Sequence, residues 1–130
     1  MQYKIIMSKK LLIFIAAVSI LTSCYNCIED EATDKYYLIE VLLDPGDGSG
    51  IFEPVESEKF IELHQDGTVT SNGEICGFGV ESNSATAGTF AFDTNTISTP
   101  YCIDLSFELV ENELIIDYPC IEPCRAKFLK

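Results

Sequence analysis

Residues 103–110, IDLSFELV, alternate apolar and polar side chains along their whole length. Successive side chains of a β-strand point to opposite faces, so this alternation places one set in a core and the other in water. The stretch therefore predicts a half-buried strand of an antiparallel sheet. Its predicted buried face is Ile103, Leu105, Phe107 and Leu109, and its wet face is Asp104, Ser106 and Glu108.

The chain from residue 36 onward has the same character on either side of this stretch. Short runs rich in Val, Ile, Phe, Tyr and Thr are separated by Gly, Asn, Asp and Pro, which is typical of strands and turns. Asp66-Gly67 predicts a tight hairpin, because this pair tolerates the positive φ angles of a primed turn. Further strands are predicted at residues 37–43, 60–64, 68–71, 89–92, around 97, 114–118 and 126–129. In the first of these strands the predicted buried face is Tyr37, Ile39, Val41 and Leu43.

These segments predict an all-β fold over residues 36–130, with about eight antiparallel strands in a meander. Such a meander closes most easily into a small barrel, because closure removes the exposed edges of the sheet. An eight-stranded barrel is just wide enough to be filled by side chains or to hold one small ligand.

The first 23 residues have the parts of a secretory signal peptide. Lys4, Lys9 and Lys10 precede the apolar run LLIFIAAVSIL, whose eleven residues are too few to span a hydrocarbon core. Residues 21–24, LTSC, resemble a bacterial lipobox, in which the cysteine is acylated after cleavage. We therefore expect residues 1–23 to be removed and Cys24 to anchor the protein in the outer membrane, on its periplasmic or its surface face. An ordinary signal peptide with an incidental cysteine is the alternative.

Residues 24–35 are acidic and without period, which predicts a flexible tether between the lipidated cysteine and the barrel. After Cys24 the chain carries five basic and twenty-one acidic residues, a net charge of −16. A chain this acidic is repelled by phosphate backbones and anionic lipids. We expect no nucleic-acid partner and no membrane contact beyond the anchor.

Five cysteines follow Cys24, which predicts two disulfides and one free thiol in an exported domain. Cys120 and Cys124 lie in YPCIEPCRAK, where two prolines can turn the chain and bring the sulfurs together. Cys76 and Cys102 then pair by elimination, which leaves Cys27 free in the tether. Sequence alone leaves this connectivity open. No metal is expected, because C-x3-C is an unusual ligand spacing and the chain has one histidine.

Residues 44–50, DPGDGSG, are either a calcium loop or a turn at the barrel mouth. An EF-hand loop needs oxygen ligands at alternate positions and a glutamate at the twelfth, but the third, fifth and twelfth residues here are Gly46, Gly48 and Val55. The alternative to a turn is an irregular calcium cage. Its oxygens would come from Asp44, Asp47, Ser49, Glu53 and Glu56.

No catalytic arrangement emerges from the sequence, so we expect neither an enzyme nor a cofactor. His64 is predicted to be an exposed hairpin residue, since no partner motif accompanies it. Ser49 does not lie in a nucleophile elbow, and Glu111 and Glu113 belong to a predicted solvated turn. Cys120 and Cys124 lack the C-x-x-C spacing of thiol oxidoreductases.

Three segments resemble small Bacteroidota lipoproteins with a lipocalin-like, calycin-type β-barrel: YYLIEVLLDPGDGSGIFEPVESEKFIEL, DGTVTSNGEIC and LIIDYPCIEPCRAKFLK. Such chains usually place a tryptophan near the start of the first strand, where this chain has Tyr36 and Tyr37 and no tryptophan at all. The resemblance implies a barrel with an apolar interior.

Two functions from different classes follow. The leading hypothesis is a lipid-anchored, extracytoplasmic binding module for a small hydrophobic ligand, with Phe90, Phe92, Leu105 and Phe107 as pocket candidates. The alternative is a structural or protein-interaction lipoprotein with a solid core, which contacts a partner protein through its barrel-mouth loops.

Overall fold

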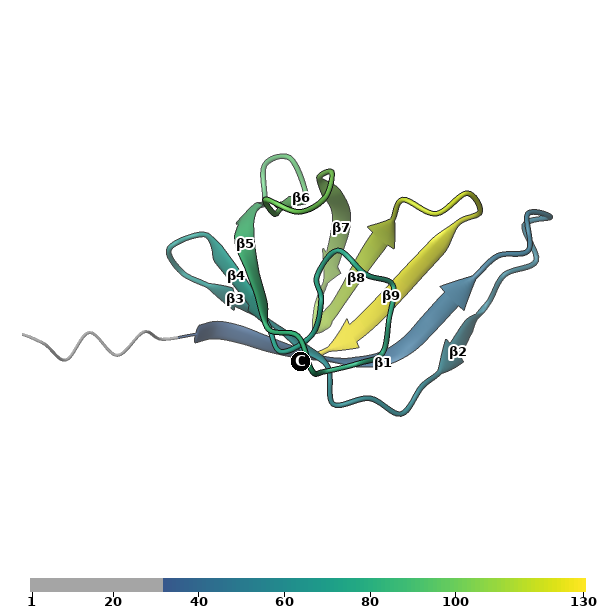
Figure 1. Cartoon of the computed structure of the whole chain (residues 1–130), viewed down its shortest axis with the longest axis horizontal. Coiled ribbons are helices and arrows are strands. Elements are labelled where there is room, and N and C mark those ends of the chain that lie inside the picture. The colour runs from purple at the N-terminus through teal and green to yellow at the C-terminus, as the bar shows by residue number, and fades with distance from the viewer. Residues whose placement is uncertain (1–31) are drawn as a thin grey trace, which may run out of the picture. The chain divides into compact units, whose positions relative to one another are not determined.

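The computed structural model describes residues 32–130, and this part of the chain is built from strands and loops (Figure 1). Cys24, Cys27 and the expected signal peptide and cleavage site lie outside the described residues. The strands are β1 (Ala32–Leu43), β2 (Phe52–Pro54), β3 (Phe60–His64), β4 (Thr68–Ser71), β5 (Thr86–Ala91), β6 (Thr96–Ser98), β7 (Leu105–Val110), β8 (Glu113–Tyr118) and β9 (Cys124–Leu129).

The strands close into an antiparallel barrel. Each strand from β3 to β9 pairs with the next one along the chain, and β1 pairs with both β3 and β9. Eight strands thus form the closed meander, and β2 is an additional short strand that pairs with the second half of β1. In Figure 1 these strands surround a common interior, with β1 along the bottom of the view. The predicted fold class is confirmed.

The first strand corrects two sequence-based expectations. It begins at Ala32, so residues 32–35, which we assigned to the tether, are paired with β3. Its buried side chains are Tyr36 and Leu38, whereas Tyr37 is 48% exposed and Leu43 is also exposed. The register shifts between Leu38 and Glu40, and such a bulge reverses which side chains face inward. Beyond the bulge, Val41 of the predicted face packs against the core, whereas Leu43 does not.

Strand β7 follows the predicted alternation from Leu105 onward. Leu105 and Phe107 are buried, and Leu109 packs against the core. Ile103, predicted to be buried, is 67% exposed, because the strand begins two residues later and Ile103 belongs to the preceding loop.

The interior of the barrel is filled by side chains of its own strands. Phe107 and Phe128 are the largest apolar side chains there, and aliphatic residues from seven strands pack around them. The aliphatic core residues on the strands are Leu38, Ile61, Leu63, Val69, Ile97, Leu105, Leu114, Ile116 and Ala126.

The connections divide the barrel into two ends. We call one the hairpin end: it holds the start of β1, the chain end at Lys130 and the tight turns around Gly67, Asn95 and Glu111. The predicted Asp-Gly hairpin is confirmed there, since Gly67 has a φ of 85° and its N–H donates to the His64 carbonyl at 3.1 Å. We call the other the loop end: it holds residues 44–51, 55–59, 72–85, 99–104 and 119–123.

Candidate functional site

An apolar pocket lies at the hairpin end, between the β3–β4 and β5–β6 turns, and we call it the hairpin pocket. It has a volume of about 210 Å³. Its floor comes from Leu63 of β3, and its sides come from the two turns and the start of β1. The lining residues are Asp34, Leu63, His64, Gln65, Gly67, Phe90 and Phe92.

Two aromatic rings form the apolar wall of the hairpin pocket. Phe90, at the end of β5, packs against the core, and Phe92, in the following turn, is 57% exposed. The centroid of the Phe92 ring lies 5.0 Å from that of Phe90 and 6.0 Å from that of Phe107, both in edge-to-face geometry. Such contacts hold the exposed ring in place. The barrel therefore presents a fixed apolar surface to solvent at this point.

The four predicted pocket residues fall into two groups. The structure brings Phe90 and Phe92 to the hairpin pocket. Leu105 and Phe107 are instead buried inside the barrel, because they occupy alternate, inward-facing positions of β7. Phe107 still supports the site through its contact with Phe92.

His64 contributes a polar group that sequence analysis did not assign to a site. It is half-buried rather than exposed, and its Nε2 lies 2.9 Å from Thr70 Oγ1. The Thr70 hydroxyl also donates to Glu62 Oε2 at 3.4 Å. The buried Nδ1 of His64 has no hydrogen-bond partner among the described residues. The pocket thus combines an apolar wall with the ring of one polar side chain.

The Asp-Gly loop at residues 44–50 is a self-contained turn at the loop end. Asp44 is buried, and its carboxylate accepts hydrogen bonds from the N–H groups of Gly46 at 2.7 Å, Gly48 at 3.0 Å and Gly50 at 2.9 Å. These bonds lower the pKa of Asp44 below its ordinary value. With its oxygens engaged by amides, Asp44 acts as the anchor of the turn. The loop lies at the end of β1, away from the hairpin pocket.

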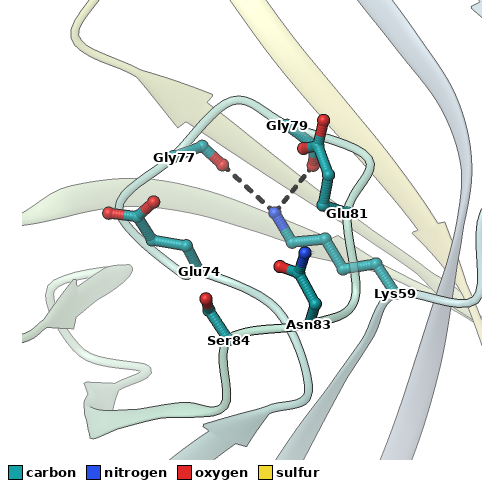
Figure 2. A pocket seen from close by; sticks show the side chains of 7 residues that line it. All are labelled: Lys59, Glu74, Gly77, Gly79, Glu81, Asn83 and Ser84. Atoms are coloured by element: carbon teal, nitrogen blue, oxygen red, sulfur yellow. Dashed lines mark hydrogen bonds between the residues drawn. The ribbon is translucent and has the colours of Figure 1, made fainter.

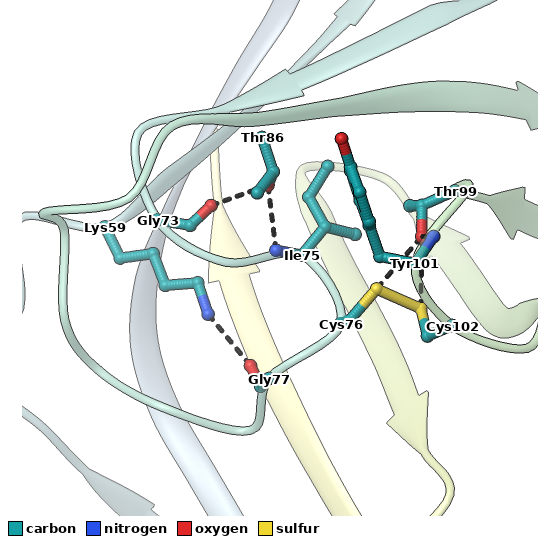
Figure 3. The surroundings of a disulfide bond; sticks show 9 residues. All are labelled: Lys59, Gly73, Ile75, Cys76, Gly77, Thr86, Thr99, Tyr101 and Cys102. Carbon is teal, nitrogen blue, oxygen red and sulfur yellow. Dashed lines mark hydrogen bonds between the residues drawn. A yellow bond between two sulfur atoms is a disulfide. The ribbon is translucent and has the colours of Figure 1, made fainter.

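The two disulfides lie at the loop end and join the predicted partners. Cys76 is bonded to Cys102, and Cys120 to Cys124. The first bridge ties loop 72–85 to loop 99–104, and the Thr99 hydroxyl lies 2.9 Å and 3.2 Å from its two sulfurs (Figure 3). A pocket of about 360 Å³ adjoins this bridge. The second bridge closes the turn between β8 and β9.

Sequence analysis also missed Lys59, which sits at the loop end. Its side chain is only 1% exposed, and it lines a polar pocket of about 200 Å³ under loop 72–85 (Figure 2). The sequence signal that points to Lys59 is its isolation, since it is the only lysine or arginine between Lys35 and Arg125 in a strongly acidic chain.

No known protein family, curated protein or solved structure matches this chain. The fold and its pockets define the class of small, closed antiparallel β-barrels with side-chain-filled interiors. Within residues 32–130 no group of three or more His, Cys, Asp or Glu side chains is arranged to hold a metal ion. No helix in the same part of the chain has the length and hydropathy to cross a membrane.

Proposed function

We propose that this protein is a lipid-anchored, extracytoplasmic binding module that holds a small hydrophobic ligand in the hairpin pocket. The observation that carries the proposal is the exposed ring of Phe92, fixed against Phe90 and Phe107 at the rim of an apolar pocket. Binding sites combine apolar walls with a few placed polar groups, and the His64 ring, whose Nδ1 has no partner among the described residues, supplies one. The ligand is therefore an apolar group that bears a single hydrogen-bonding group.

The size of the hairpin pocket limits the ligand. Pockets for drug-sized molecules measure about 300 to 1,000 Å³, and this pocket measures about 210 Å³. The filled barrel interior offers no further depth below Leu63, which is itself buried. A single ring or a short chain fits, so we propose that only such a group, or the end of a longer lipid, enters the site.

The anchor proposed at Cys24 would place this pocket near the membrane. Seven residues separate Cys24 from β1, which begins at the hairpin end. A stretch of this length reaches at most about 25 Å, since each residue spans about 3.5 Å. The proposed anchor would therefore keep the barrel within a short distance of the membrane that supplies apolar ligands.

A second candidate function is supported by the loop end. Leu43, Ile51 and Ile121 are exposed there, and they lie beside or on turns held by the Asp44 hydrogen bonds and by the Cys120–Cys124 bridge. Single exposed apolar residues are ordinary on protein surfaces, but rigid ones at one end favour contact with a partner protein. Under this alternative the barrel is a solid scaffold and its loops are the interface.

Titration with benzyl alcohol, followed by amide NMR shifts of the full chain in detergent micelles, tests the leading proposal. This probe carries one ring and one hydroxyl donor. We expect saturable shifts centred on residues 63–67 and 90–92, and about a fivefold or greater loss of affinity in Phe92→Ala, in keeping with the loss of an aromatic contact. Val110→Ala, which truncates an exposed side chain outside the pocket, serves as the control. Equal affinity in Phe92→Ala and wild type would refute the assignment.

A further inference from the structure

Loop 72–85 covers part of the loop end, and several independent contacts hold it there. Ile75 is fully buried in the core, and the Phe78 ring lies 5.5 Å from that of Tyr118, centroid to centroid. The Thr86 hydroxyl donates to the Gly73 carbonyl and accepts from the Ile75 N–H (Figure 3). Together with the Cys76–Cys102 bridge, these contacts make the loop a fixed wall.

A polar pocket lies between this wall and Lys59, and we call it the lysine pocket. Figure 2 shows the Lys59 ammonium between the carbonyls of Gly77 and Gly79, with acidic side chains on both sides. The pocket has a volume of about 200 Å³. It is lined by Lys59, Glu74, Gly77, Gly79, Glu81, Asn83 and Ser84.

The Lys59 ammonium is buried without full compensation. It donates to the Gly77 carbonyl at 3.1 Å and to the Gly79 carbonyl at 2.9 Å. An ammonium has three N–H groups, so one remains without a partner among the described residues. None of the described carboxylates forms an ion pair with it. Burying a charge without an opposite charge in contact is costly, which makes the third N–H a binding point for an anionic oxygen.

Two carboxylates border the same pocket. Glu74 and Glu81 both act on Lys59 through space and raise its pKa, while burial lowers it more strongly. Glycine leaves room for these carboxylates: a Cβ on Gly77 would lie 3.0 Å from Glu74 Oε2, and one on Gly79 would collide with Glu81 Oε2. The pocket therefore has one positive group inside and two negative groups beside it.

We propose that the lysine pocket binds a small zwitterion of the α-amino acid class, with its carboxylate on Lys59 and its ammonium between Glu74 and Glu81. A simple anion fits less well, because the two glutamates and the net charge of −16 after Cys24 repel it. A metal cation or a simple amine is repelled by Lys59. A zwitterion satisfies both signs at once, and Asn83 and Ser84 offer further polar contacts. This site lies at the loop end and does not depend on the hairpin pocket.

Calorimetric titration of the full chain with L-alanine tests this proposal, beside propionate and ethylamine, which each carry one of its two charges. We expect saturable L-alanine binding with a Kd in or below the millimolar range, roughly 4 kcal/mol or more. Propionate and ethylamine should bind at least about tenfold more weakly, because each leaves one charged group of the pocket unpaired.

Variants localise the binding. Glu74→Gln with Glu81→Gln keeps both exposed side chains near their shape, and we expect about a tenfold loss of L-alanine affinity with unchanged thermal stability. Glu56→Gln with Glu58→Gln, exposed and outside the pocket, is the matched control.

Absence of saturable alanine binding, equal binding of propionate, or full affinity in the Glu74/Glu81 double variant would each overturn the proposal. Lys59→Met is expected to abolish binding; retained binding in a folded Lys59→Met protein would also overturn it.

Discussion

Asp44 and Lys59 are the two charged side chains that the fold buries almost completely among the described residues. The protein treats them differently. Asp44 accepts three backbone N–H groups from its own loop, whereas Lys59 has two carbonyl acceptors and a third N–H left over. A buried charged group whose hydrogen bonds are all made stabilises the fold. A buried charged group with an unpaired N–H is a candidate for a binding site.

The first prediction concerns the response of Asp44 to acid. Its pKa is lowered below 3.8 by hydrogen bonds from backbone N–H groups, so the folded state holds this carboxylate ionised more strongly than the unfolded state does. Its stabilising effect is complete above pH 3.8 and is lost as the pH falls through the lowered pKa.

We therefore expect Asp44→Asn to lower the Tm by several degrees at neutral pH and by progressively less as the pH falls below about 4. Differential scanning calorimetry from pH 2 to pH 7 measures this. Glu53→Gln, exposed on the neighbouring strand, serves as the control. A Tm deficit that stays constant across the whole range would show that the carboxylate charge plays no part.

The second prediction concerns Phe128, which is fully buried and lies between Leu38 of β1 and Leu114 of β8. Phe128→Ala should lower the free energy of unfolding by about 3 to 5 kcal/mol, because it removes a large apolar side chain and leaves a cavity. Val110→Ala, at an exposed position, should change it by less than about 0.5 kcal/mol. Urea unfolding measures both values, and similar values for the two would contradict the filled barrel.

At the scale of elements, the loop end depends on covalent links that the hairpin end does not need. The hairpin end has tight turns, with positive φ angles at Gly67, Asn95 and Glu111. The loop end has longer connections, which cost more entropy to order. Both disulfides are found there. Cys76–Cys102 joins loop 72–85 to loop 99–104, and Cys120–Cys124 closes the turn between β8 and β9.

The third prediction compares the two bridges. Their cysteines are separated by 26 and 4 positions, so replacing Cys76 and Cys102 by serine should cost about 3 kcal/mol and replacing Cys120 and Cys124 about 2 kcal/mol, if restriction of the unfolded chain dominates. Loss of the first bridge should also speed amide hydrogen exchange at Ile75 and Gly77, because loop 72–85 loses its clamp.

Hydrogen exchange in the two double variants checks this comparison. Unchanged protection of loop 72–85 without the Cys76–Cys102 bridge would mean that Lys59 and Thr86 hold the loop by themselves. The Cys120/Cys124 variant is the control, since its bridge closes the β8–β9 turn and is not bonded to loop 72–85.

Elements with clear local signals could be predicted from the sequence, and those set by long-range pairing could not. Strands β3 and β4 fall at the predicted residues, because Asp66-Gly67 fixes the turn between them. The predicted buried face of β1 was wrong, because the bulge near Ile39 arises from pairing with β9, a strand about ninety residues further along the chain. Strand β2 carries no strong period of its own and forms because β1 is long enough to pair with it.

The candidate sites show the same division. The sequence predicts the four pocket candidates to be core aromatic or apolar residues, some of them facing an internal cavity. Phe90 and Phe92 instead line a pocket beside a turn, whereas Leu105 and Phe107 are buried in the filled interior. The lysine pocket could not be predicted, because loop 72–85 has no strand period and only the fold brings it over Lys59.

At the scale of the whole molecule, a filled barrel separates two pockets of different chemistry. The hairpin pocket is apolar and lies where the chain enters the barrel, and the lysine pocket is polar and lies at the other end. One small barrel would thus hold an apolar group at one end and sample polar solutes at the other.

Native mass spectrometry of the full chain, recovered from its own host in mild detergent, tests the central proposal most directly. We expect a mass increment from one small apolar molecule, present in wild type and in Val110→Ala and absent in Phe92→Ala. A protein that carries its disulfides and its proposed lipid anchor but no bound molecule in any sample would contradict the hydrophobic-ligand proposal and favour the protein-interaction role of the loop end.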